Sequence, residues 1–183
     1  MSFKHAILGL LSYTPLTGYD IKKLMQESTF MYWSGNNNQI YKALIEMDGE
    51  GLIHSETIAQ ASAPPKKVYT LTDGGLDELT RWLESDPEAP DCKKPFLVQF
   101  AWAGQLGGGA TLALLGRYEQ AVKARLGAEQ EKKKRGRFSL GGTPMEAAIW
   151  ELLYENIVGS YESELEWVAK VRKAMGKYVR AKK

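Results

Sequence analysis

Residues 36–83 read NNNQIYKALIEMDGEGLIHSETIAQASAPPKKVYTLTDGGLDELTRWL, and they carry the clearest structural signal in this sequence. Its first part has the periodicity of a helix, with polar residues turned away from an apolar face. Gly49 and Gly51 bracket the end of that helix. The side chains predicted on the inward face are Ile40, Leu44, Ile45 and Met47.

Two short strands are predicted after this helix, over Leu52 to Ala59 and Lys66 to Leu71. The connection between them contains Pro64 and Pro65, which lack the N–H donors of a strand ladder and mark an exposed loop. Helix, two strands and a further helix follow one another in the order of a winged helix. This order makes DNA the first partner to consider.

The helix after the second strand has a clear start. Thr72 is a good cap, and Asp73 lies against the positive end of the helix. Its predicted apolar face consists of Leu76, Leu79, Trp82 and Leu83.

Upstream, two more helices are predicted. The first runs from about Ser2 to Ser12 and cannot pass Pro15. Thr17 is followed three residues later by Asp20, which is the spacing of a capping box, so a second helix begins near Gly18.

The segment from Asp86 to Pro95 holds three prolines and predicts a hinge. We therefore expect a winged-helix domain over residues 1–85, a hinge over 86–95 and a helical domain over 96–183. In the helical domain, Phe96 to Leu106 predicts a short buried helix, and Gly107 to Gly109 predicts a break. A longer helix resumes from Ala110 to about Lys134.

The last predicted helix runs from about Pro144 to Met175, with Thr143 and Glu146 as start signals. A seam of eight residues advances by alternating steps of four and three, and seven of the eight are apolar; such a seam requires a partner helix. A second set widens the apolar surface at the start of this helix, so that one neighbour could lie in the same chain and another in a second subunit. This set comprises Met145, Ala148, Ile149, Leu152 and Leu153. The alternative is a single intramolecular core. The seam comprises Trp150, Tyr154, Ile157, Tyr161, Glu164, Val168, Val171 and Met175.

The composition is ordinary for a folded protein, with 44% hydrophobic and 25% charged residues among 183. The longest early apolar run, Ala6 to Leu11, is too short to span a membrane. One cysteine, Cys92, excludes an internal disulfide, and we expect a soluble cytoplasmic protein. Two histidines and one cysteine offer no metal-ligand spacing and no nucleophile, so we expect neither a metal, a cofactor nor an enzyme.

Charge is divided unevenly along the chain. Residues 1–92 hold 7 Lys plus Arg and 13 Asp plus Glu, whereas residues 93–183 hold 17 and 9. The acidic first half is unusual for duplex binding. A DNA interface there requires Lys42, Lys66 and Lys67 to lie at the contact surface and the acids from Asp73 to Asp91 to lie elsewhere.

Three stretches keep a characteristic order and spacing: HAILGLLSYTPLTGYDIKKLM (5–25), QIYKALIEMDGEGLI (39–53) and PKKVYTLTDGGLDELTRWL (65–83). In them the chain resembles the PadR family of winged-helix transcriptional regulators. The C-terminal half resembles the helical dimerisation region of the subgroup related to virulence activators. The resemblance implies a mainly α protein, an N-terminal winged helix-turn-helix with a two-stranded wing and a C-terminal α-helical dimerisation domain. It also implies a homodimer, joined through the C-terminal helices, that binds a double-stranded DNA operator, usually as a repressor.

The predicted DNA contacts lie on the first turns of the helix after Asn36. Asn and Gln amides can bond adenine, and Tyr and Lys suit phosphates or base edges. By resemblance, Asn38, Gln39, Tyr41 and Lys42 occupy the family's reading positions. The Asn run could instead serve only as a cap and turn.

Lys66 and Lys67, at the wing, would reach the DNA backbone or the adjacent minor groove. A solvated turn is the alternative for this pair. The run from Lys132 to Arg137, with five basic residues in six, is interpreted as a solvated loop and is left out of the site.

Aromatic residues near the predicted dimer interface, Trp102, Trp150 and Tyr154, could bind a small aromatic effector; core packing is the alternative. A second class of function also stays open. The acidic first half permits a winged-helix protein–protein interaction module without significant DNA affinity.

Overall fold

The computed structural model describes residues 3–31, 37–59, 65–90, 93–136, 140 and 142–180. The chain forms two compact units, Met1–Glu88 and Ala89–Lys183, whose boundary falls within the proline-rich segment. Within the described ranges, no helix has the length and apolar character needed to cross a membrane.

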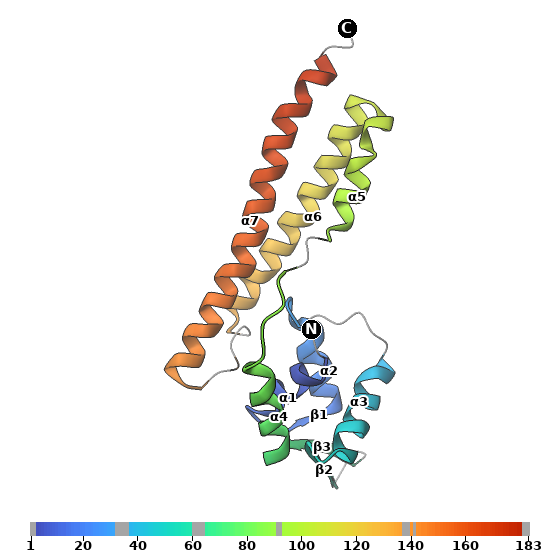
Figure 1. Cartoon of the computed structure of the whole chain (residues 1–183). Coiled ribbons are helices and arrows are strands. Elements are labelled where there is room, and N and C mark those ends of the chain that lie inside the picture. The colour runs from blue at the N-terminus through green and yellow to red at the C-terminus, as the bar shows by residue number, and fades with distance from the viewer. Residues whose placement is uncertain are drawn as a thin grey trace. The chain divides into compact units, whose positions relative to one another are not determined.

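The first unit packs four helices with a small sheet (Figure 1). Its helices begin and end close to the predicted positions. In chain order, the elements are α1 (Phe3–Leu11), β1 (Leu16–Thr17), α2 (Gly18–Glu27), α3 (Asn37–Gly49), β2 (Ile53–Ile58), β3 (Lys66–Leu71) and α4 (Asp73–Leu83).

The sheet is antiparallel, in the order β1-β3-β2. The pairing of β2 with β3 runs from Ile53 opposite Leu71 to Ile58 opposite Lys66, so the predicted two-stranded wing is confirmed. The third strand, β1, was not predicted, because two residues are too few to show a period. Pro64 of the predicted wing loop and Asn36, a predicted cap, lie outside the described residues.

The core of the first unit explains the inward face of α3. Ile40, Leu44 and Met47 are buried, as predicted, but Ile45 is 66% exposed and its predicted inward position is wrong. Steps of four and three place residues 40, 44 and 47 on one side of a helix, and residue 45 turns about 100° from residue 44. The other fully buried side chains of this unit include Ile7, Leu8, Ile21, Met25 and Ile53.

Both predicted caps of this unit are present. The Thr17 hydroxyl accepts from the backbone N–H of Asp20 at 3.1 Å, and the Asp20 carboxylate accepts from the N–H of Thr17 at 3.2 Å. At α4, the Thr72 hydroxyl accepts from the N–H of Gly75 and donates to the carbonyl of Gly51 at 2.7 Å. Thr72 thus starts α4 and also joins it to the turn after α3.

The predicted apolar face of α4 is mostly exposed. Leu79 is buried, whereas Leu76, Trp82 and Leu83 are exposed to 49%, 40% and 67%. The start of the helix is tight at Gly75, where an added Cβ would lie 2.0 Å from the carbonyl oxygen of Leu52. Only glycine allows α4 to approach the turn before β2 so closely.

The second unit is entirely helical where it is described: α5 (Pro95–Ala101), the 3-10 helix η1 (Ala103–Leu106), α6 (Gly108–Lys134) and α7 (Pro144–Arg180). The predicted single buried helix over residues 96–106 is wrong in two respects. It is split at Trp102, and only Phe96 and Ala103 in it are buried. The predicted glycine break is also shorter, because Gly107 alone, with φ of 76°, precedes α6.

The two long helices α6 and α7 run side by side (Figure 1). The predicted seam of α7 faces inward: Trp150 and Val168 are buried and the other six members are half-buried. Glu164, the polar member, accepts a hydrogen bond of 2.8 Å from the Tyr118 hydroxyl and pairs with the Lys94 ammonium group. The seam therefore packs against α6 of the same chain.

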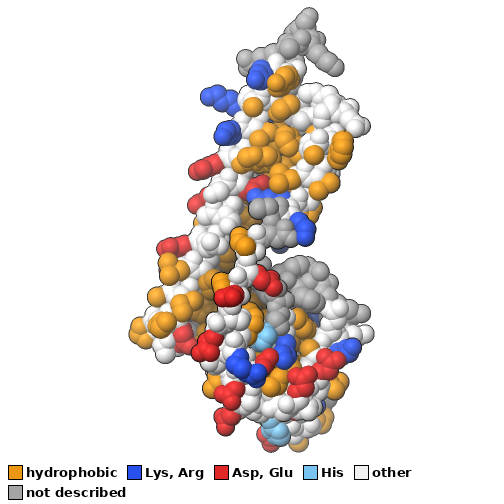
Figure 2. All heavy atoms as spheres, viewed as in Figure 1, with side chains coloured by type: hydrophobic (Ala, Val, Ile, Leu, Met, Phe, Trp, Pro, Cys, Tyr) orange, Lys and Arg blue, Asp and Glu red, His pale blue; other side chains and the backbone are white. Residues whose placement is uncertain are grey.

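The second apolar set of α7 lies outside this packing. Met145, Ile149 and Leu152 are exposed to 75%, 46% and 63%. Figure 2 shows hydrophobic side chains gathered at this first part of α7. The two stripes of α7 therefore differ in role: one closes the helical unit, and the other leaves an apolar surface.

Candidate nucleic-acid interface

The outward face of α3 is polar over its first turns, and the opposite face of the same helix is buried in the core. Asn38 and Gln39 are exposed, Tyr41 is 44% exposed and Lys42 is also exposed. The structure therefore brings all four predicted α3 residues to the surface. Their backbone is fixed because Ile40, on the opposite side, is anchored in the core.

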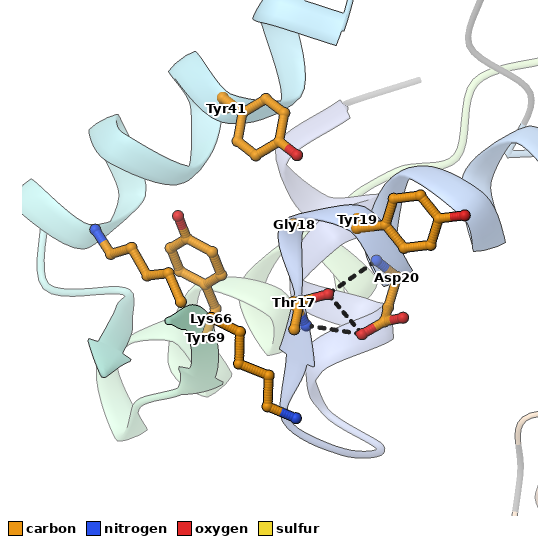
Figure 3. A pocket seen from close by; sticks show the side chains of 8 residues that line it. Thr17, Gly18, Tyr19, Asp20, Tyr41, Lys66 and Tyr69 are labelled. Carbon is orange, nitrogen blue, oxygen red and sulfur yellow. Dashed lines mark hydrogen bonds between the residues drawn. The ribbon is translucent and has the colours of Figure 1, made fainter. Parts of the chain in front are cut away.

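A pocket of about 460 Å³ lies beside this face. The start of α2, the first turns of α3 and the strand β3 enclose it (Figure 3). The Tyr41 and Tyr69 rings reach into it from α3 and β3. The pocket is lined by Thr17, Gly18, Tyr19, Asp20, Tyr41, Lys66, Lys67 and Tyr69.

Gly18 leaves room for the Tyr41 ring where α2 and α3 meet. A Cβ added there would lie 2.7 Å from Cε1 of Tyr41. The absence of a side chain lets the Tyr41 ring pack over the start of α2. Tyr41, a predicted contact residue, is thereby positioned by an element about twenty residues earlier in the sequence.

Each of two predicted contact lysines is also close to a carboxylate. Lys42 lies 3.7 Å from Glu46, and Lys67 lies 3.7 Å from Asp48. The Ser55 hydroxyl donates a 2.5 Å hydrogen bond to Asp48. This hydrogen bond, together with the charge of Lys67, holds the pKa of the Asp48 carboxyl below its ordinary value. The interface thus holds anionic groups beside its cations.

Part of the acidic charge of the first unit is compensated away from the pocket. Glu78 of α4 accepts from the Lys4 ammonium at 3.0 Å and from the Arg81 guanidinium at 2.8 Å. His5 lies 3.3 Å from the same carboxylate and stacks on the Trp82 ring at 4.8 Å. Hydrogen bonds from Lys4 and His5 lower the pKa of Glu78. His5 therefore joins α1 to α4.

Two aromatic residues of the pocket, Tyr19 and Tyr69, are not among the predicted contacts. Tyr19, 65% exposed, comes directly after the residue that starts α2. Tyr69 is buried and shares its side of β3 with Lys67, whose ammonium group lies 5.4 Å from the ring centroid. The alternation of β3 could have revealed Tyr69, whereas nothing local marks Tyr19.

The aromatic residues predicted for an effector do not form one site within a single chain. Trp102 is 69% exposed and precedes η1, where Ala103 accepts a hydrogen bond from Thr111 at the start of α6. Trp150 is buried near the start of α7, which lies beside the end of α6. There, the Lys133 ammonium group lies 4.2 Å from the Tyr154 ring centroid. Thr111 and Lys133 are separated by roughly 30 Å of helix. Within one chain, Trp102 therefore lies far from Trp150 and Tyr154.

The basic run at the end of α6 is largely paired. The Lys132 ammonium lies 2.7 Å from Glu129, Lys134 lies 2.9 Å from Glu131, and Lys133 pairs with Glu151. The three lysines belong to the helix, so the loop predicted to begin with them starts later; Arg137 lies outside the described residues. Among the residues with described positions, no group of three or more His, Cys, Asp or Glu could hold a metal ion.

Two domain families match this chain. The model of the "Transcriptional regulator PadR-like family" matches residues 7–81, and that of the "Virulence activator alpha C-term" matches residues 92–176. The negative transcriptional regulator PadR of Bacillus subtilis is 42% identical over 91 residues, which cover 50% of this chain and 50% of that protein. The chain thus spans about half the length of the curated relatives it matches.

Solved structures resemble the chain over most of its length. B. subtilis PadR in complex with operator DNA is 28% identical, with a TM-score of 0.81 over 94% of this chain and 98% of that one. B. subtilis PadR in complex with p-coumaric acid is 27% identical, with a TM-score of 0.76 over the same shares.

The fold and the exposed face of α3 define a winged-helix protein with a C-terminal helical unit. The two matched domains follow one another in the order PadR-like, then virulence activator alpha C-terminal. The chain belongs to the PadR-like family of transcriptional regulators, in its virulence-activator-like subgroup.

Proposed function

We propose that this chain is a sequence-specific DNA-binding transcriptional regulator that acts as a homodimeric repressor. The observation that carries the proposal is the exposed polar start of α3, held rigidly by the buried Ile40, Leu44 and Met47. The resemblance to B. subtilis PadR, whose structure includes operator DNA, supports the same use of this face.

In this proposal α3 enters the major groove, where a helix fits and base edges differ in their donors and acceptors. The amides of Asn38 and Gln39 bond to base edges, and Tyr41 and Lys42 contact base edges or phosphates. Lys66 and Lys67, which flank the pocket beside α3, contact the backbone and carry no sequence information.

Dimer formation is proposed through the exposed apolar surface of α7 at Met145, Ile149 and Leu152. Burial of these side chains against a second copy removes apolar area from water, the main favourable term in association. Two copies would present two α3 helices to half-sites roughly 34–36 Å apart on one face of the duplex. The sign of regulation is proposed from the B. subtilis relative, which is named as a negative regulator.

A small aromatic effector is part of the proposal. Support comes from B. subtilis PadR, whose structure in complex with p-coumaric acid resembles this chain. Trp102, Trp150 and Tyr154 are the proposed contacts. Within one chain, Trp102 lies far from Trp150 and Tyr154, so an effector site that uses all three residues would be built by two subunits. Binding of a ligand there would change the distance between the two α3 helices of the dimer.

The test is a titration of labelled duplex with the full-length protein at 50 and 200 mM salt, followed by fluorescence anisotropy. The probes are the DNA upstream of the gene that encodes this chain and duplexes selected from a random pool. We expect one selected sequence to bind at least 10³-fold more tightly than scrambled duplex, with affinity falling as salt rises. Equal, weak binding to every duplex would instead favour a winged-helix module that binds other proteins.

A further inference from the structure

Ile45 is an aliphatic side chain placed on the surface of α3 rather than in the core. It is 66% exposed, while its neighbour Leu44 is fully buried. The fold of the first unit therefore gains little from an apolar residue at this position. Its side chain is available to a partner of α3.

The position of Ile45 on the helix is central to the outward face. Residues three and four apart line up along a helix, and Asn38, Lys42, Ile45 and Gly49 follow in steps of four, three and four. Gly49 has no side chain, and a Cβ added there would meet nothing within 4 Å. Ile45 is thus the last side chain on the line that starts with Asn38.

The surroundings of Ile45 favour nucleic acid over a protein partner. Its neighbours on α3 are polar: Asn38 and Lys42 precede it on the same line, and Lys42 pairs with Glu46 at 3.7 Å. A protein interface buries a broad apolar patch, whereas a base edge offers a single methyl group. One branched side chain between polar neighbours matches the smaller target.

Thymine is the base whose major-groove edge carries a methyl group. We propose that Ile45 contacts the 5-methyl group of a thymine in each operator half-site and selects a T·A pair at that position. An adenine or cytosine there would place an amino donor, and a guanine polar acceptors, against an apolar side chain that cannot pair with them. The inference rests on the proposed function, and it assigns to α3 a specificity-determining residue beyond Asn38, Gln39, Tyr41 and Lys42.

The experiment removes the 5-methyl group of thymine and the side chain of Ile45 in turn. A duplex is first selected from a random pool with the full-length wild-type protein. Each thymine of its half-sites is then replaced, one symmetric pair at a time, by deoxyuridine, which lacks only the methyl group. Dissociation constants are measured for the wild type and for Ile45→Ala. For the wild type, we expect one replacement to weaken binding roughly fourfold per half-site, the effect of one buried methyl group.

For Ile45→Ala, thymine and deoxyuridine at that position should bind equally, while Ile45→Val should keep most of the preference. Leu83→Ala, which truncates a side chain of similar exposure on α4, is the matched control and should leave the ratio of the two affinities unchanged. Because alanine favours helix and residue 45 is exposed, the variant should fold.

Deoxyuridine replacements could weaken the binding of the wild type and of Ile45→Ala by the same factor. That result would overturn the role of Ile45 but not the proposal that the protein recognises DNA. A selection that enriches no sequence would overturn the proposed function, and the role of Ile45 with it.

Discussion

The hydroxyl group of Tyr118 donates a 2.8 Å hydrogen bond to the carboxylate of Glu164, the acidic member of an otherwise apolar seam. Lys94, just before α5, pairs with the same carboxylate. The Tyr118 ring stacks on Phe96 with centroids 3.6 Å apart. The Glu164 carboxylate and the Tyr118 ring therefore join α5, α6 and α7 in the second unit.

Burial and the hydrogen bond to Glu164 raise the pKa of Tyr118 to about 12. A raised pKa means that the folded state favours the neutral phenol. The stabilisation is full below the unfolded value of about 10 and is lost as pH rises through about 12. We expect Tyr118→Phe to lower the free energy of unfolding at pH 7 by about 1 kcal/mol.

Urea denaturation followed by circular dichroism checks this expectation. Between pH 9 and pH 12, the wild type should lose stability faster than Tyr118→Phe, so that the difference between them shrinks. A gap that stays constant over this range would show that Tyr118 ionises normally in the folded protein.

Asp48 places a negative charge beside Lys67, and its removal should strengthen DNA binding. In Asp48→Asn, the Lys67 ammonium group loses its ion pair with the carboxylate 3.7 Å away and is available to a DNA phosphate. We expect affinity to rise several-fold at 50 mM salt and less at 200 mM salt, by the same factor for all sequences. Anisotropy titrations of selected and scrambled duplexes measure both effects. Ser55→Ala, which removes a partner of Asp48 but not its charge, is the control and should change affinity little.

The close approach at Gly75 makes it far more sensitive to substitution than its neighbour. In Gly75→Ala, the new methyl group would meet the Leu52 carbonyl oxygen at 2.0 Å, so the backbone must move. Gly74→Ala has its nearest contact at 3.5 Å and serves as the matched control. Thermal unfolding should show a loss of about 2 kcal/mol or more for Gly75→Ala and little change for Gly74→Ala. Similar midpoints for the two variants would contradict the tight packing of α4 on the turn before β2.

Base reading and phosphate binding should separate by mutation. Gln39→Ala is expected to reduce discrimination between the selected duplex and single-base variants, because an amide that pairs with a base edge is lost. Lys66→Ala combined with Lys67→Ala is expected to weaken binding similarly across sequences. The double variant should also flatten the dependence of log Kd on log salt by about two. An unchanged salt slope in that double variant would remove the wing from the interface.

The exposed stripe of α7 predicts a variant that is folded but monomeric. Leu152→Glu puts a charge into the proposed apolar interface, which a dimer cannot bury without a partner. Sedimentation velocity should give a single-chain mass, with unchanged helical content. Asn156→Glu, also exposed and one turn later on α7, should leave the association state unaltered. Wild-type protein that sediments only as single chains would disprove the dimer.

Local sequence rules predicted most of the elements. The capping boxes at Thr17 and Thr143 involve residues three apart, and both are formed. The strands β2 and β3 followed from the turn residues between them and from β-favouring side chains. Such features depend on near neighbours in the chain, so the pattern of residue types is sufficient to find them.

The wrong predictions have two origins. The apolar side chain of Ile45 suggests an inward position, but the period of the helix by itself directs it outward. The other wrong predictions concern packing between segments. The same reasoning overestimated the burial of Trp102 and Leu106, which belong to a short helical segment that offers only a few inward positions. The pairing of Lys67 with Asp48 joins β3 to the end of α3, which no local spacing reveals. Burial and charge pairing need the tertiary arrangement.

The division of α3 into a buried side and an outward line has an evolutionary consequence. None of the side chains at positions 38, 42 and 45 is part of the buried core. Under the proposed function, substitutions there would alter which promoter is occupied while the fold persists. A duplicated copy of this gene would then acquire a new regulon through a handful of codon changes, with the scaffold inherited intact.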